Sequence, residues 1–208
     1  MAVPFRPPDE DDRSSSTATH RSLLQRARLR DAAAWERMIA LYGPLVLGWC
    51  RAWGLREADA ADAFQEVFQA VAAHLPGFHR GRAGGTFRGW LWTITRNKVN
   101  DHYRRDAREP AGIGGSEARD LLARVAGAGP PDEAGGEAAD TALLHRALAM
   151  IRGEFEPRTW EAFWHTAVDG RAAADVAADL GMTPGAVRVA KSRVLHRLRT
   201  DLEDLLDG

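Results

Sequence analysis

The sequence contains one cysteine, Cys50, and no long apolar run among its 208 residues. A single cysteine excludes an internal disulfide and any zinc cluster built from several cysteines. No apolar stretch approaches the roughly 20 residues that a membrane-spanning helix requires. Alternating apolar and polar runs, which are typical of strands, are also lacking. We therefore expect an all-α protein in the cytoplasm, with Cys50 as a buried structural thiol.

The composition divides the chain into segments. Residues 1–19 are rich in proline, serine and aspartate and have no hydrophobic signal core, so we expect a disordered leader. Residues 20–108 show helical periodicity, with a first block around 21–53 that is interrupted near Gly43-Pro44 and a second block at 57–74.

The remaining residues form a linker and a second helical domain. Residues 109–140 hold many glycines and alanines, three prolines and no aromatic residue, which indicates a flexible linker with at most a helical turn at ARDLLARVAG. Residues 141–208 predict four helices: one around Leu143 to Ile151, and three that begin near Pro157, Ala172 and Pro184. The architecture we expect is two small helical domains joined by this linker.

Charge is distributed very unevenly along the chain. The total is −1, but residues 21–108 carry 15 basic and 8 acidic residues, a net charge of +7. Residues 109–140 carry 2 basic and 7 acidic residues, a net charge of −5. A basic domain beside an acidic linker indicates that the basic part binds a polyanion.

The segment from Thr86 to Arg105 combines aromatic residues and cations on one predicted helix. These residues are Phe87, Trp90, Trp92, Tyr103, Arg88, Arg96, Lys98, Arg104 and Arg105. Cations bind phosphates and aromatic faces stack on unpaired bases, so the segment suits partly melted nucleic acid. The spacing also fits an ordinary amphipathic helix. We expect a core stripe and an exposed remainder; the core stripe comprises Phe87, Trp90, Leu91 and Ile94.

Residues 172–199 have the pattern of a helix-turn-helix. A short helix is followed by a turn at Gly181 and a longer helix capped by Thr183 and Pro184. The predicted internal packing uses Ala173, Val176, Ala177, Leu180, Val187, Val194 and Leu198. From Pro184 through Arg199 there are five cations and no anion, which suits docking on DNA. The alternative is a helical hairpin with a solvated basic face.

Together these motifs resemble the extracytoplasmic-function (ECF) class of bacterial RNA polymerase sigma factors, in the sigma-70 family. The resemblance is carried by DAADAFQEVFQAV at 59–71, FRGWLWTITRNKVNDHYRR at 87–105 and the helix-turn-helix at 172–199. It implies a factor that binds core RNA polymerase and directs promoter-specific transcription initiation. Region 2 would span 20–108 and region 4 would span 141–208.

The resemblance also implies residue roles. Core polymerase would dock on Asp59, Asp62, Gln65 and Glu66, although Ala61 stands where the family usually has an acidic residue. The segment 79–86 and the helix after it would capture the melted minus-ten element, through Arg88, Trp92, Arg96, Asn97, Asn100, Tyr103 and Arg104. The minus-thirty-five element would be read by Thr183, Gly185, Ala186, Arg188, Val189, Lys191, Ser192 and Arg193. The acidic linker would follow the RNA-exit path.

Some of these assignments have alternatives at the level of residues. The loop RGRAGG at 80–85 suits close approach to a DNA strand or serves as a plain connector. Asn97 and Asn100 suit hydrogen bonds to base edges or simple exposure to solvent.

Two other classes of function remain as rivals. A repressor or response-regulator output would use the helix-turn-helix but leaves the 59–105 pattern unexplained. An enzyme is not expected, because the seven histidines show no metal-ligand spacing and no phosphate loop or catalytic triad stands out. We expect no metal and no cofactor. The expected partners are core polymerase and promoter DNA, and the sequence leaves open whether an anti-sigma factor is a third.

Overall fold

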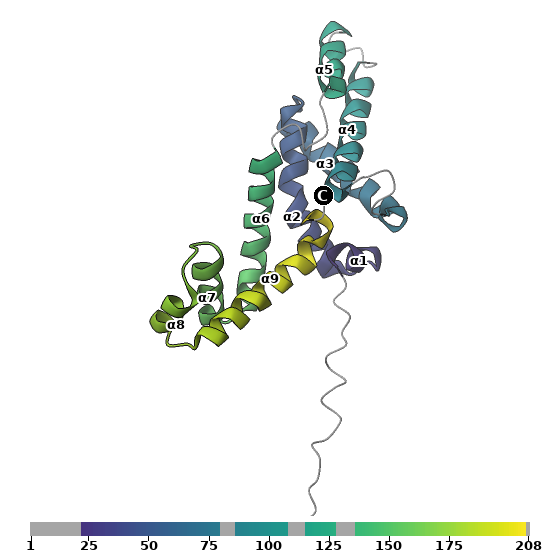
Figure 1. Ribbon diagram of the computed structural model, residues 1–208. Coiled ribbons are helices and arrows are strands. Elements are labelled where there is room, and N and C mark those ends of the chain that lie inside the picture. The colour runs from purple at the N-terminus through teal and green to yellow at the C-terminus, as the bar shows by residue number, and fades with distance from the viewer. Residues whose placement is uncertain (1–21, 80–85, 108–114, 128–135, 207–208) are drawn as a thin grey trace, which may run out of the picture.

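The structure is a computed structural model that describes residues 22–79, 86–107, 115–127 and 136–206. These residues form helices and no strand, which confirms the all-α class (Figure 1). The predicted leader at 1–19 and the loop RGRAGG lie outside the described residues. Within the described ranges, no helix has both the length and the apolar character to cross a membrane.

Four helices build the N-terminal unit: α1 (Leu23–Arg28), α2 (Ala32–Ala52), α3 (Glu57–His74) and α4 (Phe87–Asp106). Side-chain caps explain where three of them begin. Ser22, Asp31 and Thr86 each accept a hydrogen bond from a backbone N–H three residues later, which satisfies a donor that the first helical turn leaves unpaired. The bounds of α3 match the block predicted at 57–74.

The prediction of a break near Gly43-Pro44 is wrong. α2 runs through Pro44, and the chain breaks earlier, between Arg28 and Ala32. Pro44 is exposed, so the ring and the missing N–H do not disturb the core. Gly43 lies where α2 meets α3, and a Cβ there would come within 3.0 Å of the Phe64 ring. The close packing of α2 on α3 therefore allows α2 to continue through Gly43-Pro44, a residue pair that usually ends a helix.

Five further helices follow: α5 (Gly115–Gly127), α6 (Gly136–Ile151), α7 (Pro157–Ala167), α8 (Ala173–Leu180) and α9 (Pro184–Leu206). The last four are the helices predicted for 141–208, although α6 begins five residues before that range. The expectation of a mainly flexible 109–140 segment is wrong for residues 115–127. They form α5, which packs along α4.

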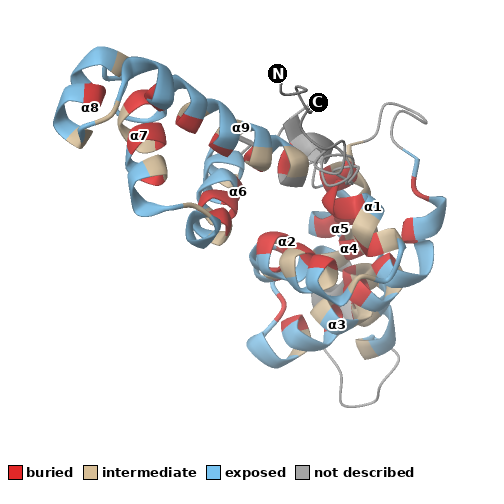
Figure 2. Cartoon of the chain, turned by 90° about the horizontal axis from the view of Figure 1, so that it is seen from below, coloured by how far each residue is buried: buried red, intermediate tan, exposed pale blue. Residues whose placement is uncertain are grey.

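The C-terminal helices pack against the N-terminal unit rather than standing apart from it. α6 contacts α2, and the last turns of α9 contact α1 and α4 (Figure 1). Figure 2 shows buried positions along α6 and α9 as well as inside the N-terminal unit. Leu143 of α6 and Val194 and Leu202 of α9 are each under 4% exposed. They belong to the same apolar cluster as Met38 and Leu41 of α2. Burial of each such side chain contributes about 1.5–3 kcal/mol.

Candidate nucleic-acid interface

The four residues predicted to bind core polymerase lie on α3, along one side of the helix. Asp62 and Gln65 are exposed, while Asp59 and Glu66 are half-buried. Asp62, Gln65 and Glu66 line a groove of about 350 Å³ between α3 and the end of α4. The structure therefore brings three of the four together, and Asp59 lies a turn earlier in an ion pair of 2.9 Å with Arg56.

Among these acidic residues, Glu66 forms ion pairs with two cations of α4, Lys98 and Arg105. Burial alone would raise its pKa, but a hydrogen bond from Arg105 at 2.9 Å and the charge of Lys98 at 3.5 Å outweigh that effect and lower the pKa. Glu66 therefore stays ionised and links α3 to α4. Asp62 and Gln65 remain the more accessible pair for a partner.

The face of α4 that packs inward differs from the prediction. Phe87 and Leu91 are buried as expected, but Trp90 and Ile94 are only half-buried. Arg88, Trp92 and Tyr103, which the sequence placed on the exposed face, are buried instead. Periodicity alone could not separate these stripes, because large residues occur around most of the helix.

The buried aromatic residues of α4 pack on the end of α2. Trp92 meets Trp53 edge to face with ring centroids 6.0 Å apart, and the Tyr103 hydroxyl donates a hydrogen bond of 2.9 Å to the Trp53 carbonyl oxygen. Burial raises the pKa of Tyr103. These contacts make Trp92 and Tyr103 part of the N-terminal core, so the exposed placement predicted for them is wrong.

Two cations of α4 are bound by segments further along the chain. Arg88 forms an ion pair with Asp140 of α6. Arg96 lies over the Trp92 ring, with its guanidinium carbon 5.3 Å from the centroid, and donates to the backbone oxygens of Val125 and Ala126. Those oxygens belong to the last turn of α5, where carbonyl groups lack helical partners and attract cations.

A second side of α4 remains open to solvent. Asn97 and Arg104 are exposed, and Asn100 is half-buried. Asn97 and Arg104 are seven residues apart, so they lie on the same side of the helix, two turns from one another. This side carries two amide groups and a cation that are accessible without any rearrangement of the described residues.

Five of the seven residues predicted to pack inside the helix-turn-helix are buried, and the other two, Ala173 and Leu180, are half-buried against the same cluster. Val176, Ala177, Val187, Val194 and Leu198 are all under 8% exposed. Gly181 ends α8 in the left-handed conformation, with φ of +59°, and Thr183 caps α9 by accepting a hydrogen bond from the Ala186 N–H. The internal register of α8 against α9 is therefore fixed by apolar burial and by one glycine.

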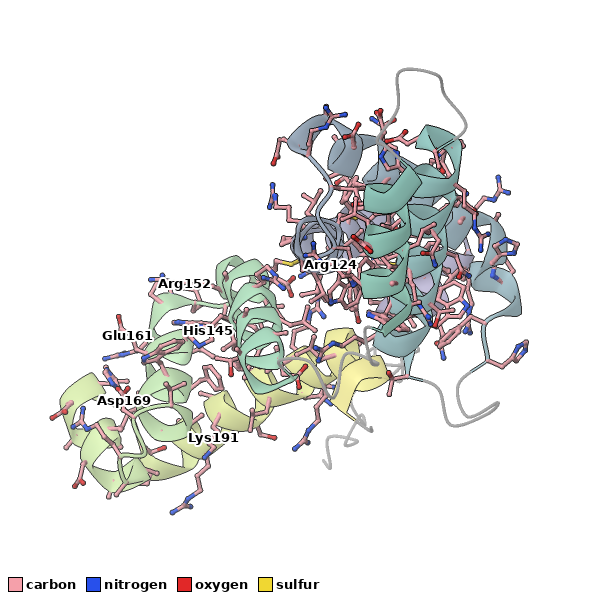
Figure 3. All side chains as sticks on the ribbon, turned by 90° about the horizontal axis from the view of Figure 1, so that it is seen from above. Arg124, His145, Arg152, Glu161, Asp169 and Lys191 are labelled. Atoms are coloured by element: carbon pink, nitrogen blue, oxygen red, sulfur yellow. The ribbon has the colours of Figure 1, made fainter. Side chains whose placement is uncertain are left out.

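The residues predicted to read the minus-thirty-five element lie together at the start of α9. Seven are exposed: Thr183, Gly185, Ala186, Arg188, Val189, Ser192 and Arg193. Lys191 is half-buried, and its ammonium group donates to the Thr166 carbonyl oxygen at 3.4 Å. Val189 is 59% exposed, which is high for an apolar side chain with no described partner surface to cover it. Figure 3 places Lys191 at the end of the C-terminal helices remote from α1–α4.

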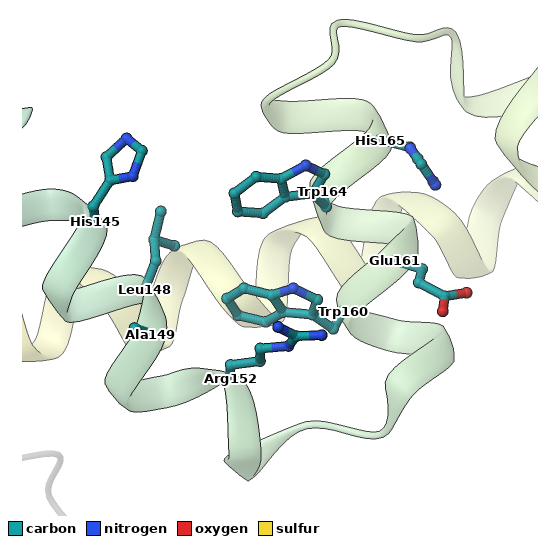
Figure 4. Close-up of a pocket in the computed structure, with 8 residues that line it drawn as sticks. All are labelled: His145, Leu148, Ala149, Arg152, Trp160, Glu161, Trp164 and His165. Carbon is teal, nitrogen blue, oxygen red and sulfur yellow. The ribbon is translucent and has the colours of Figure 1, made fainter.

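An aromatic groove lies between α6 and α7. Trp160 and Trp164 stack with centroids 6.1 Å apart, and both rings point toward His145 and Leu148 of α6 (Figure 4). The groove holds about 500 Å³. Trp160 is buried, and Trp164 is half-buried at the groove wall.

Sequence reasoning missed the residues that connect the two halves of the chain. Glu154 of the short helix η4 (Arg152–Glu154) pairs with Arg37 of α2 at 2.5 Å and with Arg197 of α9 at 2.6 Å. Burial would raise the Glu154 pKa, but hydrogen bonds from Arg197 and Arg37 lower it. No local sequence signal could have identified this cluster, because its members are more than 40 residues apart.

Comparison with known proteins adds independent information. The Sigma-70 region 2 family model matches residues 38–109. The chain is 30% identical over 189 residues to the RNA polymerase sigma factor CnrH of Cupriavidus metallidurans, covering 90% of this chain and 94% of that protein. It is 32% identical over 192 residues to the ECF RNA polymerase sigma factor ShbA of Streptomyces griseus, covering 90% and 97%.

Solved structures also match, and one of them is described as the structure of CnrH in complex with the cytosolic domain of CnrY. It shares 27% sequence identity and covers 89% of this chain and 97% of that one, with a TM-score of 0.36.

Proposed function

Because the chain belongs to the ECF sigma factors of the sigma-70 family, which direct transcription initiation by RNA polymerase, we propose that it binds core polymerase through α3 and reads promoter DNA through α4 and α9. In this proposal α4 binds the melted minus-ten element and the start of α9 reads the minus-thirty-five element. The N-terminal unit and the helix-turn-helix then serve as regions 2 and 4.

The observation that carries the DNA-reading proposal is the surface of α9. Seven of its eight candidate residues are exposed on the first turns of one helix, and the segment from Pro184 to Arg199 has cations and no anion. Arg188 and Arg193 suit base edges or phosphates, and Val189 suits the methyl group of thymine. Thr183 and the backbone at the helix start suit a phosphate.

The minus-ten proposal rests on fewer accessible groups. Asn97, Asn100 and Arg104 form the open side of α4 and suit an unpaired strand, through amide hydrogen bonds and phosphate contact. Arg88 and Arg96 can contact DNA only when their partners within the chain, Asp140 and the backbone oxygens of Val125 and Ala126, are displaced. Trp92 and Tyr103 support this surface from beneath.

The polymerase-binding proposal rests on the groove between α3 and α4. Asp62 and Gln65 are exposed there, beside a Glu66 that is held ionised. An acidic and polar groove of this kind suits a basic helical surface on the partner. An anti-sigma factor is a further candidate partner, on the strength of the family alone.

Gel filtration of the full chain with purified core RNA polymerase tests the proposal against the repressor alternative. We expect the chain to elute with the polymerase. Separate elution of the two, with specific binding to duplex DNA by the chain alone, would favour a repressor.

A further inference from the structure

The aromatic groove between α6 and α7 lies outside the surfaces proposed to contact polymerase and DNA. α6 and α7 each pack on α9 but make few contacts with one another, so a cavity of about 500 Å³ remains between them (Figure 4). This volume falls within the range of about 300–1,000 Å³ that is typical of small-molecule sites. The groove is therefore large enough to hold a small organic ligand.

The walls of the aromatic groove favour a planar ring. Trp160 and Leu148 are 8% and 7% exposed, whereas Trp164 is half-buried and Ala149 is exposed. The indole rings of Trp160 and Trp164 are nearly parallel, with an interplanar angle of 29°. Because Trp164 is packed on Trp160 and still partly open to the groove, a flat aromatic group can stack against it and bury apolar surface on both sides.

The aromatic groove also holds a cation without a partner. Figure 4 shows Arg152 next to the Trp160 ring and His145 opposite Trp164. In the described part of the chain, neither the Arg152 guanidinium nor the His145 ring has a hydrogen-bond or ion-pair partner. A guanidinium group offers a planar fork of N–H donors that matches the two oxygens of a carboxylate. Arg152 therefore favours a ligand that carries a negative charge.

The other titratable side chains of the groove do not neutralise Arg152. His165 is paired on its own helix, with its Nδ1 atom 2.6 Å from the Asp169 carboxylate. Glu161 also lines the groove, but Figure 4 shows its carboxylate directed away from His145. No ion pair joins Glu161 to Arg152 among the described side chains. The positive charge beside the aromatic wall is thus available to a ligand.

We propose that the aromatic groove binds a planar aromatic carboxylate, whose ring stacks against Trp164 and whose carboxylate accepts hydrogen bonds from Arg152. Leu148 and Ala149 shield the ring from water on the α6 side. Charge complementarity decides the class of ligand, because a neutral ring would leave the Arg152 guanidinium without a partner and a non-aromatic acid would leave the indole unstacked. The site shares no residue with the surfaces proposed for polymerase and DNA, so the inference does not depend on the proposed function.

Titration of the full chain with naphthoate, a fused-ring aromatic carboxylate, tests this inference. Two-dimensional NMR of the tryptophan indole N–H groups follows binding, and single replacements by phenylalanine assign the signals of the seven tryptophans. We expect saturable shifts of the Trp160 and Trp164 signals. Signals from the N-terminal unit, such as that of Trp53, should not move with the same concentration dependence.

Two further compounds separate the contributions of the ring and of the charge. Naphthamide keeps the fused rings without the charge, and cyclohexanecarboxylate keeps the charge without an aromatic ring. Each should bind about tenfold more weakly than naphthoate or weaker still, because each loses one class of contact.

Variants of the groove provide the matched test in the protein. Arg152→Gln should weaken naphthoate binding about tenfold and leave naphthamide binding unchanged. Arg158→Gln removes an exposed cation of α7 that does not line the groove, and it should bind naphthoate like the wild type. Ala149→Phe places a ring inside the groove and should abolish binding of both compounds.

Equal affinity of the three compounds would overturn the inference, as would equal weakening of naphthoate by Arg152→Gln and Arg158→Gln. Shifts that are alike for all seven tryptophans would also overturn it, because they indicate binding without a defined site. If naphthoate moves neither Trp160 nor Trp164 while core polymerase broadens both signals, the groove is a protein-docking surface and the small-molecule assignment is wrong.

Discussion

Tyr103 donates a hydrogen bond of 2.9 Å to the backbone oxygen of Trp53, and both residues are buried. The contact joins the end of α4 to the end of α2, 50 residues away in sequence. It gives Tyr103 a structural role at a position where the family resemblance implies a DNA contact. The two roles predict different consequences for one substitution.

Tyr103→Phe keeps the ring and removes the hydroxyl. Because the Trp53 carbonyl loses a buried donor, we expect the free energy of unfolding to fall by about 1–3 kcal/mol. Urea denaturation at neutral pH measures this change. Transcription by the folded variant should match the wild type; unchanged stability with reduced transcription would instead make Tyr103 a DNA contact.

Arg188→Ala should weaken recognition of the upstream promoter element and leave polymerase binding intact. Arg188 is exposed on the second turn of α9, so its loss removes a base or phosphate contact without a change in folding. We expect a loss of about 1–3 kcal/mol in promoter binding. Promoter binding by the polymerase complex measures the loss, and Arg152→Ala, which removes an exposed cation outside the helix-turn-helix, is the control. Equal effects of the two variants would contradict the assignment.

Replacement of Asp62 and Gln65 together by alanine should weaken binding to core polymerase and leave the contacts of α9 with the upstream promoter element intact. Both side chains are exposed, so stability should change by less than about 0.5 kcal/mol for each. Affinity for core polymerase should fall about tenfold or more, because contacts in the proposed interface are lost. A fluorescence titration of labelled chain with core polymerase measures the affinity. Glu36→Ala, an exposed acidic residue on α2, should bind like the wild type, and a parallel loss there would point to a charge effect.

Two glycine substitutions should change stability in opposite directions. Gly181→Ala forces a Cβ into the left-handed conformation at the helix-turn-helix, 3.1 Å from the Arg158 guanidinium, and should destabilise by about 1 kcal/mol. Gly48→Ala lies inside α2 with no atom within 4 Å of the new Cβ, and should stabilise by about 0.5–1 kcal/mol. Thermal unfolding measures both. If both substitutions changed the free energy of unfolding in the same direction, the left-handed conformation of Gly181 would not explain the effect of Gly181→Ala.

Much of the secondary structure could be predicted from the sequence. Apolar periodicity gave the bounds of α3, and Thr183 with Pro184 marked the start of α9, because these signals act within a few residues. The length of α5 was underestimated, with no more than a helical turn predicted at ARDLLARVAG, because its apolar residues Leu121, Leu122 and Val125 are too few to stabilise an isolated helix. It depends on packing along α4, which is a contact between distant segments.

The candidate site was predicted unevenly for the same reason. The exposed residues of α9 could be predicted because the way α8 packs on α9 is determined by the spacing of apolar residues close together in the sequence. For α4, two stripes of large residues could face the core. Contacts with α2 and its C-cap decide which is buried: Tyr42 meets the Phe87 ring edge to face at 4.9 Å between centroids, and Trp53 meets Trp92. Pairing of Arg88 with Asp140 joins residues 52 positions apart and has no local signal.

Run-off transcription with purified core polymerase on fragmented genomic DNA, followed by sequencing of transcript 5′ ends, tests the central claim most directly. With the chain added, we expect new start sites that share two sequence elements upstream, and the Arg188→Ala variant should lose the sites that depend most on the upstream element. Start sites identical to those of core polymerase alone would contradict the assignment of this chain as the promoter-reading subunit.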